Sequence, residues 1–149
     1  MARVQLALRV SDLTESIAFY SKLFGTEPAK LRPGYANFAI EEPPLKLVLI
    51  EGDDGRPTTM DHLGVEVFST DEVAAATTRL RDAGLATFSE EDISCCYARQ
   101  DKVWVHGPGN EPWEVYTVKA DADTLARADG SVCCGTPAGT ASPAGSGCC

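Results

Sequence analysis

The chain has 149 residues, of which 44% are hydrophobic and 23% charged, and this suits one domain with a sizeable core. A formal net charge of −9 argues against nucleic acid and anionic membranes as partners, because both attract surfaces rich in Lys and Arg. No apolar run approaches the roughly 18 residues of a membrane helix, and the N-terminal segment does not resemble a signal peptide. We therefore expect a cytoplasmic protein with reduced cysteines.

The first third of the chain predicts a strand, a helix and two further strands. Apolar residues alternate over residues 4–10, which indicates a half-buried strand. A helix is expected next, capped by Asp12 and ended by Gly25. Extended segments follow at 36–40 and 45–50, with Pro-containing turns before and between them. The apolar face of the helix consists of Leu13, Ile17, Tyr20, Leu23 and Phe24.

The same pattern then begins again. Residues 62–68 alternate like the first strand, and residues 70–82 are expected to form a helix that Thr70 caps and Gly84 ends. Further strands are predicted near residues 85–88, 97–100, 103–106 and 113–118.

An internal repeat links the two halves. A shift of 57 residues aligns QLALRV at 5–10 with HLGVEV at 62–67, and a helix and strands follow both segments. We infer an α+β domain over residues 1–120, built from two βαβββ modules at about 1–52 and 60–119, whose open sheet lines a cleft. The two modules pack within one chain or are exchanged in a homodimer; the pattern leaves both arrangements open.

Residues 121–149 differ in composition from the rest of the chain. They are rich in Gly, Ala, Ser and Pro, and such a segment buries too little apolar surface to offset its ordering entropy. We expect a disordered tail that carries two of the three cysteine pairs, Cys133-Cys134 and Cys148-Cys149.

All six cysteines of the chain occur as adjacent pairs, and the third pair is Cys95-Cys96. Two neighbouring thiolates form a clamp for a soft atom such as trivalent arsenic, cadmium, copper(I) or zinc. The alternative for Cys95-Cys96 is a pair of small buried apolar residues. Its polar flanks favour a loop over residues 89–102 that reaches across the mouth of the cleft, with Tyr97 and Lys102 among its polar contacts.

Three polar residues of the predicted strands are candidates for one metal site. Gln5 and His62 are equivalent in the repeat, and both are out of phase with the apolar residues that should face the helices. Glu114 lies in the last strand, in phase with Tyr116. An amide, an imidazole and a carboxylate on one face would leave open positions for water, substrate or O₂. Taken singly, each of these residues is more often structural or solvated than a ligand.

Several segments resemble a known superfamily. SIAFYSKLFG, DHLGVEV and GPGNEPWEVYTV resemble the vicinal-oxygen-chelate superfamily of glyoxalases, bleomycin-resistance proteins and extradiol dioxygenases, over residues 1–119. SCCYARQDKVWV, together with VQLALRVSDL and PWEVYTV, resembles the carbon–arsenic lyases and their relatives, the cadmium-induced proteins.

The resemblance implies an Fe(II)- and O₂-dependent dioxygenase. Its substrate would be a trivalent organoarsenical, such as methylarsenite or an aromatic arsenical, and methylarsenite would yield arsenite and formaldehyde. Its iron ligands would be Gln5, His62 and Glu114, while Cys95 and Cys96 would bind the substrate arsenic. A four-ligand glyoxalase site is disfavoured, because its additional carboxylate is expected near Leu45–Leu47 and none stands there.

Two other functions stay open at this point. The same cysteines would suit a protein that sequesters cadmium or arsenite without oxygen chemistry. An isomerase or thiol transferase of the glyoxalase type would not need Cys95-Cys96. The pairs in the tail either capture arsenic and pass it on or are dispensable.

Overall fold

A computed structural model describes residues 2–125 of the chain. The first half contains β1 (Arg3–Val10), α1 (Leu13–Phe24), β2 (Lys30–Arg32), β3 (Tyr35–Ile40) and β4 (Leu45–Glu51). The second half contains β5 (Thr59–Glu66), α2 (Thr70–Asp82), β6 (Phe88–Cys95), β7 (Ala98–His106) and β8 (Pro112–Asp121). None of the helices within this range is long and apolar enough to cross a membrane.

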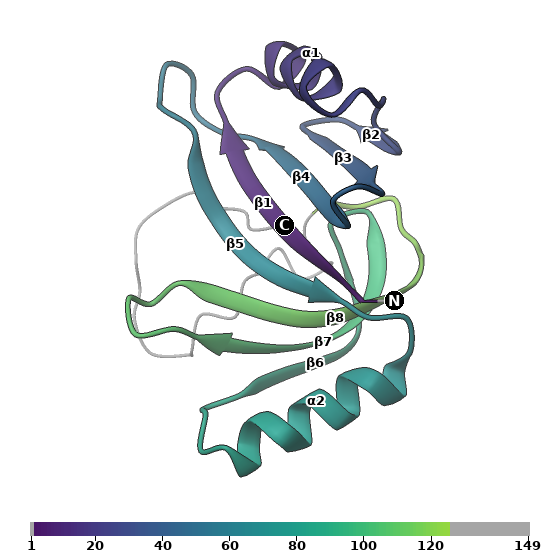
Figure 1. Ribbon diagram of the computed structural model, residues 1–149, viewed down its shortest axis with the longest axis vertical. Helices are drawn as coiled ribbons and strands as arrows, with labels where there is room; N and C mark the ends of the chain where they lie inside the picture. Colours follow the sequence, from purple (N-terminus) through teal and green to yellow (C-terminus); the bar gives the residue numbers. More distant parts are fainter. Residues whose placement is uncertain (1, 126–149) are drawn as a thin grey trace.

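The eight strands form one curved sheet in the order β2-β3-β4-β1-β5-β8-β7-β6. The two halves join where β1 and β5 pair antiparallel, with Leu6 opposite Leu63. Within each half, the first strand pairs parallel with the last, β1 with β4 and β5 with β8. Figure 1 shows the two halves bending toward each other, with α1 and α2 on the outside. The prediction of an α+β fold with two βαβββ modules is confirmed, and both modules are formed within this chain.

Each helix covers the outer face of its own module. The helix α1 packs against β3 and β4, and α2 packs against β7 and β8. Strand alternation supplies the apolar face, because successive side chains point to opposite sides of a sheet. In β1, Leu6 and Leu8 therefore join the α1 core, which leaves Gln5 on the concave side. In β5, Val65 joins the α2 core in the same way, while His62 lies on the concave side.

A separate apolar cluster lies between the two modules and includes the cysteine pair. The turn between β6 and β7 holds Cys96 and Tyr97. Its backbone donates hydrogen bonds from Cys96 N to Leu125 O and from Tyr97 N to Thr124 O, each 2.9 Å long. The segment after β8 thus runs beside the cysteine turn and anchors it. The members of this cluster are Ala7, Tyr35, Val48, Ile50, Cys95, Cys96 and Tyr97, with Leu125 packed against them.

The expected loop over residues 89–102 is wrong, because this segment is the β6–β7 hairpin. Its polar residues suggested a loop, but several of them are buried and bonded inside the structure. The indole nitrogen of Trp104 donates to Glu90 across the hairpin at 3.0 Å, and Asp101 accepts from Thr70 at 2.6 Å. Partners from other elements therefore allow a polar segment to form two strands.

Smaller differences concern the ends of elements. Ser69, one residue before the predicted cap, caps α2 and accepts from Glu72 N. The short strand β2 was not predicted, and the strand expected at 85–88 begins only at Phe88. Leu23, expected on the apolar face of α1, is 58% exposed. The tail cysteines Cys133, Cys134, Cys148 and Cys149 lie outside the described residues.

Candidate metal and thiol site

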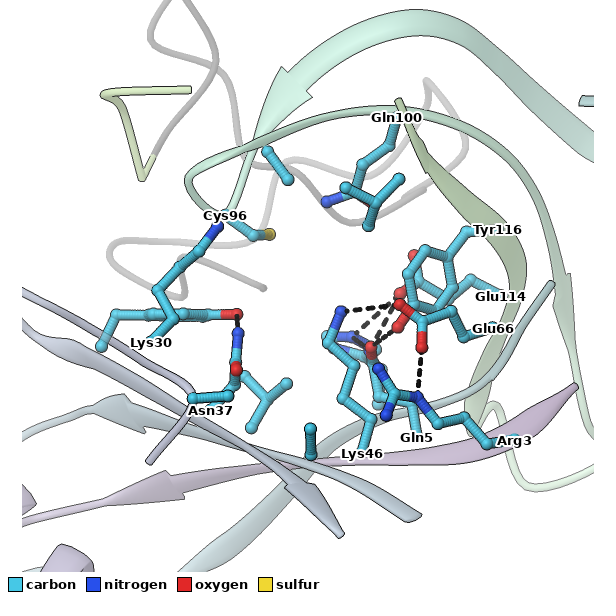
Figure 2. Close-up of a pocket in the computed structure, with 17 residues that line it drawn as sticks. Arg3, Gln5, Lys30, Asn37, Lys46, Glu66, Cys96, Gln100, Glu114 and Tyr116 are labelled. Carbon is cyan, nitrogen blue, oxygen red and sulfur yellow. Dashed lines mark hydrogen bonds and ion pairs between the residues drawn. The ribbon is translucent and has the colours of Figure 1, made fainter. Parts of the chain in front are cut away.

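Three donor side chains from three adjacent strands meet on the concave face of the sheet. Gln5 comes from β1, His62 from β5 and Glu114 from β8. Gln5 Nε2 lies 2.9 Å from His62 Nε2 and 3.0 Å from Glu114 Oε1, and the latter two atoms lie 3.4 Å apart. All three residues are at most 4% exposed. Figure 2 shows Gln5 and Glu114 gathered on one side of the cavity.

These separations fit a single metal ion. Ligand bonds of about 2.1 Å at right angles place neighbouring donor atoms about 3.0 Å apart. An amide oxygen, an imidazole nitrogen and a carboxylate oxygen on one face form a set with positions left for other ligands. At present the amide nitrogen of Gln5 faces His62 and Glu114. The amide group would have to rotate by half a turn to present its oxygen to a metal. No group of three His, Cys, Asp or Glu side chains within residues 2–125 could hold a metal, so a metal at this site would depend on the amide of Gln5 as its third ligand.

His62 is oriented by the residue beside it. Its Nδ1 donates to Asp61 Oδ1 at 2.8 Å, so in the neutral ring Nε2 carries the lone pair, on the side of Gln5 and Glu114. Neighbouring residues of a regular strand point to opposite faces, but the pairing shifts here: Ala7 faces His62 and Leu8 faces Met60. This irregularity turns Asp61 toward the ring.

A buried ion pair supports Glu114. Lys102 Nζ lies 2.8 Å from Glu114 Oε2, and both side chains are almost completely inaccessible. Burial acts to raise the pKa of Glu114, but the charge of Lys102 and the hydrogen bond from His62 outweigh it and lower that pKa to about 2. The carboxylate is therefore ionised throughout the physiological pH range. Burial lowers the pKa of His62, but its hydrogen bonds to Asp61 and Glu114 leave it raised.

Further polar residues line the cavity on the same side as Gln5 and Glu114 (Figure 2). Tyr116 Oη donates to Gln5 Oε1 and so fixes the amide. Glu66 pairs with Arg3 and, at 3.2 Å, with Lys46. Burial lowers the pKa of Lys46, although Glu66 opposes this effect.

The strand register also locates the counterpart of Glu114 in the first module. Ala7 and Gly64 are equivalent under the 57-residue shift. Gly64 pairs with Glu114, and Ala7 pairs with Val48. The equivalent position is therefore Val48, one residue beyond the segment expected from the sequence, and it carries no donor atom. The register therefore gives the first module no counterpart of the Glu114 carboxylate.

The cysteine turn closes the other side of the same cavity. Cys96 lines it and is 9% exposed, whereas Cys95 is fully buried; their sulfur atoms lie 3.0 Å apart. Cys96 and Tyr97 have φ angles of 59° and 57°, a conformation that is uncommon for residues other than glycine. Tyr97 Oη donates to Pro33 O at 2.9 Å, and Lys30 Nζ donates to Tyr97 O at 3.1 Å. These contacts fix the strained turn against the first module.

The structure thus brings Gln5, His62, Glu114 and Cys96 around one cavity of about 220 Å³. Lys102, expected on a loop, is a strand residue behind Glu114. Tyr97 anchors the turn and does not line the cavity, and His106, the other histidine of the chain, is exposed. Asp61 was missed, because its position depends on an irregular register that the sequence does not reveal.

The fold, two βαβββ modules around one cavity, points to a class of protein, and sequence comparison identifies it. Residues 3–115 match the Glyoxalase/Bleomycin resistance protein/Dioxygenase superfamily. The chain belongs to this superfamily.

Named relatives are similar over most or all of the chain. A "Trivalent organoarsenical cleaving enzyme" of Thermomonospora curvata is 67% identical over the full length of both chains. The cadmium-induced protein CadI of Mycobacterium tuberculosis is 61% identical over 84% of this chain and 82% of that protein. A trivalent organoarsenical cleaving enzyme of Bacillus sp. is 41% identical over 83% of this chain and 77% of its own.

Solved structures share the fold at low sequence identity. The Mn(II)-bound glyoxalase of Novosphingobium aromaticivorans superimposes with a TM-score of 0.58 at 21% identity, covering 83% of this chain and 42% of that one. An extradiol ring-cleaving dioxygenase of B. fuscum gives a TM-score of 0.59 at 21% identity, covering 83% and 34%.

Proposed function

We propose that this protein cleaves the carbon–arsenic bond of trivalent organoarsenicals with O₂, using Fe(II) held by Gln5, His62 and Glu114. The observation that carries the proposal is the shared cavity, in which Cys96 faces the three donor residues. The 67% identity with a trivalent organoarsenical cleaving enzyme supports the substrate class. The chemistry of the donor set, with one carboxylate and open positions, supports iron.

The cysteine pair would hold the substrate. Methylarsenite carries two hydroxyl groups, and the thiols of Cys95 and Cys96 replace both with release of water. The arsenic is then bonded to two sulfurs and one carbon, and that carbon is directed into the cavity. Fixing the substrate beside the metal ligands converts a meeting of two molecules into a step within one complex, which can lower the barrier by several kcal/mol.

The residues of the site prepare the metal position. Fe(II), when bound, would activate dioxygen next to the held arsenical. Asp61 keeps the proton of His62 on Nδ1, so that Nε2 is available as a ligand. Lys102 keeps Glu114 ionised, and Tyr116 contacts the amide of Gln5. The buried surroundings restrict the access of bulk water to the reacting groups.

The proposed reaction balances without another reductant. Methylarsenic dithiolate and dioxygen yield formaldehyde and hydroxyarsenic dithiolate. The carbon–arsenic bond breaks, one oxygen atom forms the carbonyl of formaldehyde, and the other binds arsenic as hydroxyl with a proton from the methyl group. Arsenic stays trivalent, and the carbon supplies all the electrons that dioxygen accepts.

Substitution of the cysteine pair tests the role of the thiols. Cys95→Ser and Cys96→Ser should each abolish arsenite release while Fe(II) binding persists, because serine cannot replace a thiolate for arsenic. A matched control replaces Cys133 and Cys134 by serine and should keep the turnover rate at saturating substrate. Full turnover in both Cys95→Ser and Cys96→Ser would refute the proposed tether.

A second candidate is sequestration of cadmium or arsenite, which the 61% identity with cadmium-induced proteins favours. Pure sequestration requires no iron and consumes no O₂. Oxygen uptake during incubation with an organoarsenical therefore separates the two functions.

A further inference from the structure

Gln100 is a buried residue of β7 whose side chain lines the cavity. It is 4% exposed, and Figure 2 shows it extending into the cavity from the same hairpin as Cys96. Its Nε2 donates to Cys95 O at 3.1 Å. Its Oε1 is buried and has no hydrogen-bond partner among the residues that the structure describes. The amide nitrogen thus contacts the cysteine pair, while the amide oxygen is left without a partner in a residue that lines the same cavity as Cys96.

The orientation of the amide is fixed by its partner. A backbone carbonyl only accepts hydrogen bonds, so the atom of Gln100 that contacts Cys95 O is the donor nitrogen. The oxygen is therefore the atom left open. The cations that line the cavity already have carboxylate partners: Arg3 and Lys46 pair with Glu66, and Lys30 pairs with Asp121.

An open acceptor at this place has a chemical consequence. A buried carbonyl oxygen without a partner is unfavourable, so a ligand that donates a hydrogen bond to it is favoured. The ligand proposed for this cavity is an arsenic atom on two thiolates. Its third substituent decides whether it can donate: a carbon substituent has no suitable hydrogen, whereas a hydroxyl has one.

We propose that Gln100 Oε1 accepts a hydrogen bond from the hydroxyl group of trivalent arsenic bound to Cys95 and Cys96. The inference rests on the proposed function, because it takes the substrate dithiolate to carry carbon and the product dithiolate to carry hydroxyl. Gln100 then stabilises arsenic only once oxygen has replaced carbon. An interaction that appears as the carbon–arsenic bond is exchanged for an oxygen–arsenic bond assists the reaction, since it favours the later state over the earlier one.

Binding of two arsenicals tests this role without turnover. Metal-free, full-length protein with Cys133, Cys134, Cys148 and Cys149 replaced by serine is titrated anaerobically with arsenite and with methylarsenite, using a phosphine as the only reductant. The measured quantity is the ratio of the two dissociation constants, because any disturbance of the cysteine turn affects both ligands alike. Gln100→Met should weaken arsenite binding relative to methylarsenite binding by about threefold to tenfold, the effect of one hydrogen bond.

Gln100→Glu is the matched variant, because it loses the donor to Cys95 O but keeps an acceptor. It should retain the arsenite preference of the parent protein or exceed it. An unchanged ratio of the two dissociation constants in Gln100→Met would overturn the proposal. This result is expected if Oε1 forms a hydrogen bond only with water. An equal fall of the ratio in both variants would also overturn it, because the loss would then follow from the bond to Cys95.

The same experiment separates this inference from the proposed function. If neither arsenical binds in a manner that depends on Cys95 and Cys96, the proposed tether fails, and the role of Gln100 fails with it. If both bind through these cysteines and the ratio does not respond to Gln100→Met, only the role of Gln100 is refuted.

Discussion

Single residues of the site act through specific partners. Gln5, His62 and Glu114 are buried, and each contacts one further polar side chain: Tyr116, Asp61 and Lys102, respectively. Asp61 is in turn held by Arg9, whose Nη2 lies 2.7 Å from Asp61 Oδ2. The charged groups Glu114 and Asp61 retain a defined orientation in this setting, because any other position would leave a buried charge unpaired.

Asp61, which accepts the hydrogen bond from His62 Nδ1, should control the affinity of the site for a metal ion. Asp61→Ala removes the acceptor for His62 Nδ1, so the ring loses its fixed tautomer and orientation. We expect the affinity for Fe(II), or for Co(II) followed by its visible absorption, to fall about 10- to 100-fold. Asp53→Ala is the control, because Asp53 forms an exposed ion pair with Arg56. Equal affinities in Asp61→Ala and the unsubstituted protein would exclude this role of Asp61.

At the scale of elements, sequence patterns predicted most strands but not their partners. Alternation in β1 and β5 correctly separated residues facing the helices from Gln5 and His62. The β6–β7 hairpin was misjudged, because the burial of Glu90, Gln100 and Asp101 depends on side chains far away in the sequence. The orientation of Asp61 follows from a shift in strand register, which is a property of the paired strands and leaves no mark in one of them.

Asp101 joins α2 to the hairpin and should make stability depend on pH. It accepts hydrogen bonds from Thr70 Oγ1 and from Asp92 N. Burial acts to raise the pKa of Asp101, but these bonds and Lys119 lower it below its ordinary value of 3.8. The ionised group therefore stabilises the fold above about pH 4, and this contribution disappears as the pH falls through the lowered pKa.

Asp101→Asn should accordingly reduce the free energy of unfolding by about 1–2 kcal/mol at pH 7. The difference from the unsubstituted protein should shrink below pH 4, as measured by urea unfolding at several pH values. Asp54→Asn, in the exposed segment between β4 and β5, should change little at any pH. A difference that stays constant down to pH 2 would contradict the assignment.

The whole molecule places two kinds of chemistry on opposite sides of one cavity. The proposed metal ligands come from β1, β5 and β8, where the modules meet, and Cys96 comes from the turn at the far end of the β6–β7 hairpin. Residues 122–125 bond to that turn, so the chain leaves the described structure next to the cysteine pair. The sequence predicted the repeat and the donor set, whereas this closure depends on contacts between distant segments.

The two cysteine pairs beyond residue 125 should affect substrate capture and not the chemical step. A chain ending at Leu125 keeps the segment that bonds to the cysteine turn. We expect its rate at saturating organoarsenical to be unchanged and its KM to rise several-fold, because thiols tethered nearby raise the local concentration of arsenic. Full-length protein with the four tail cysteines replaced by serine should behave in the same way. A loss of the saturated rate would show that the tail belongs to the site.

The most direct test of the proposed function measures O₂ uptake and products together. Protein loaded anaerobically with Fe(II) is mixed with trivalent methylarsenite in aerated buffer, and dissolved O₂, arsenite and formaldehyde are followed in one sample. The proposed reaction predicts equal amounts of O₂ consumed, arsenite formed and formaldehyde formed, with His62→Ala inactive. Tight binding of methylarsenite through Cys95 and Cys96, without O₂ uptake or arsenite, would contradict carbon–arsenic cleavage and leave a protein that sequesters arsenic.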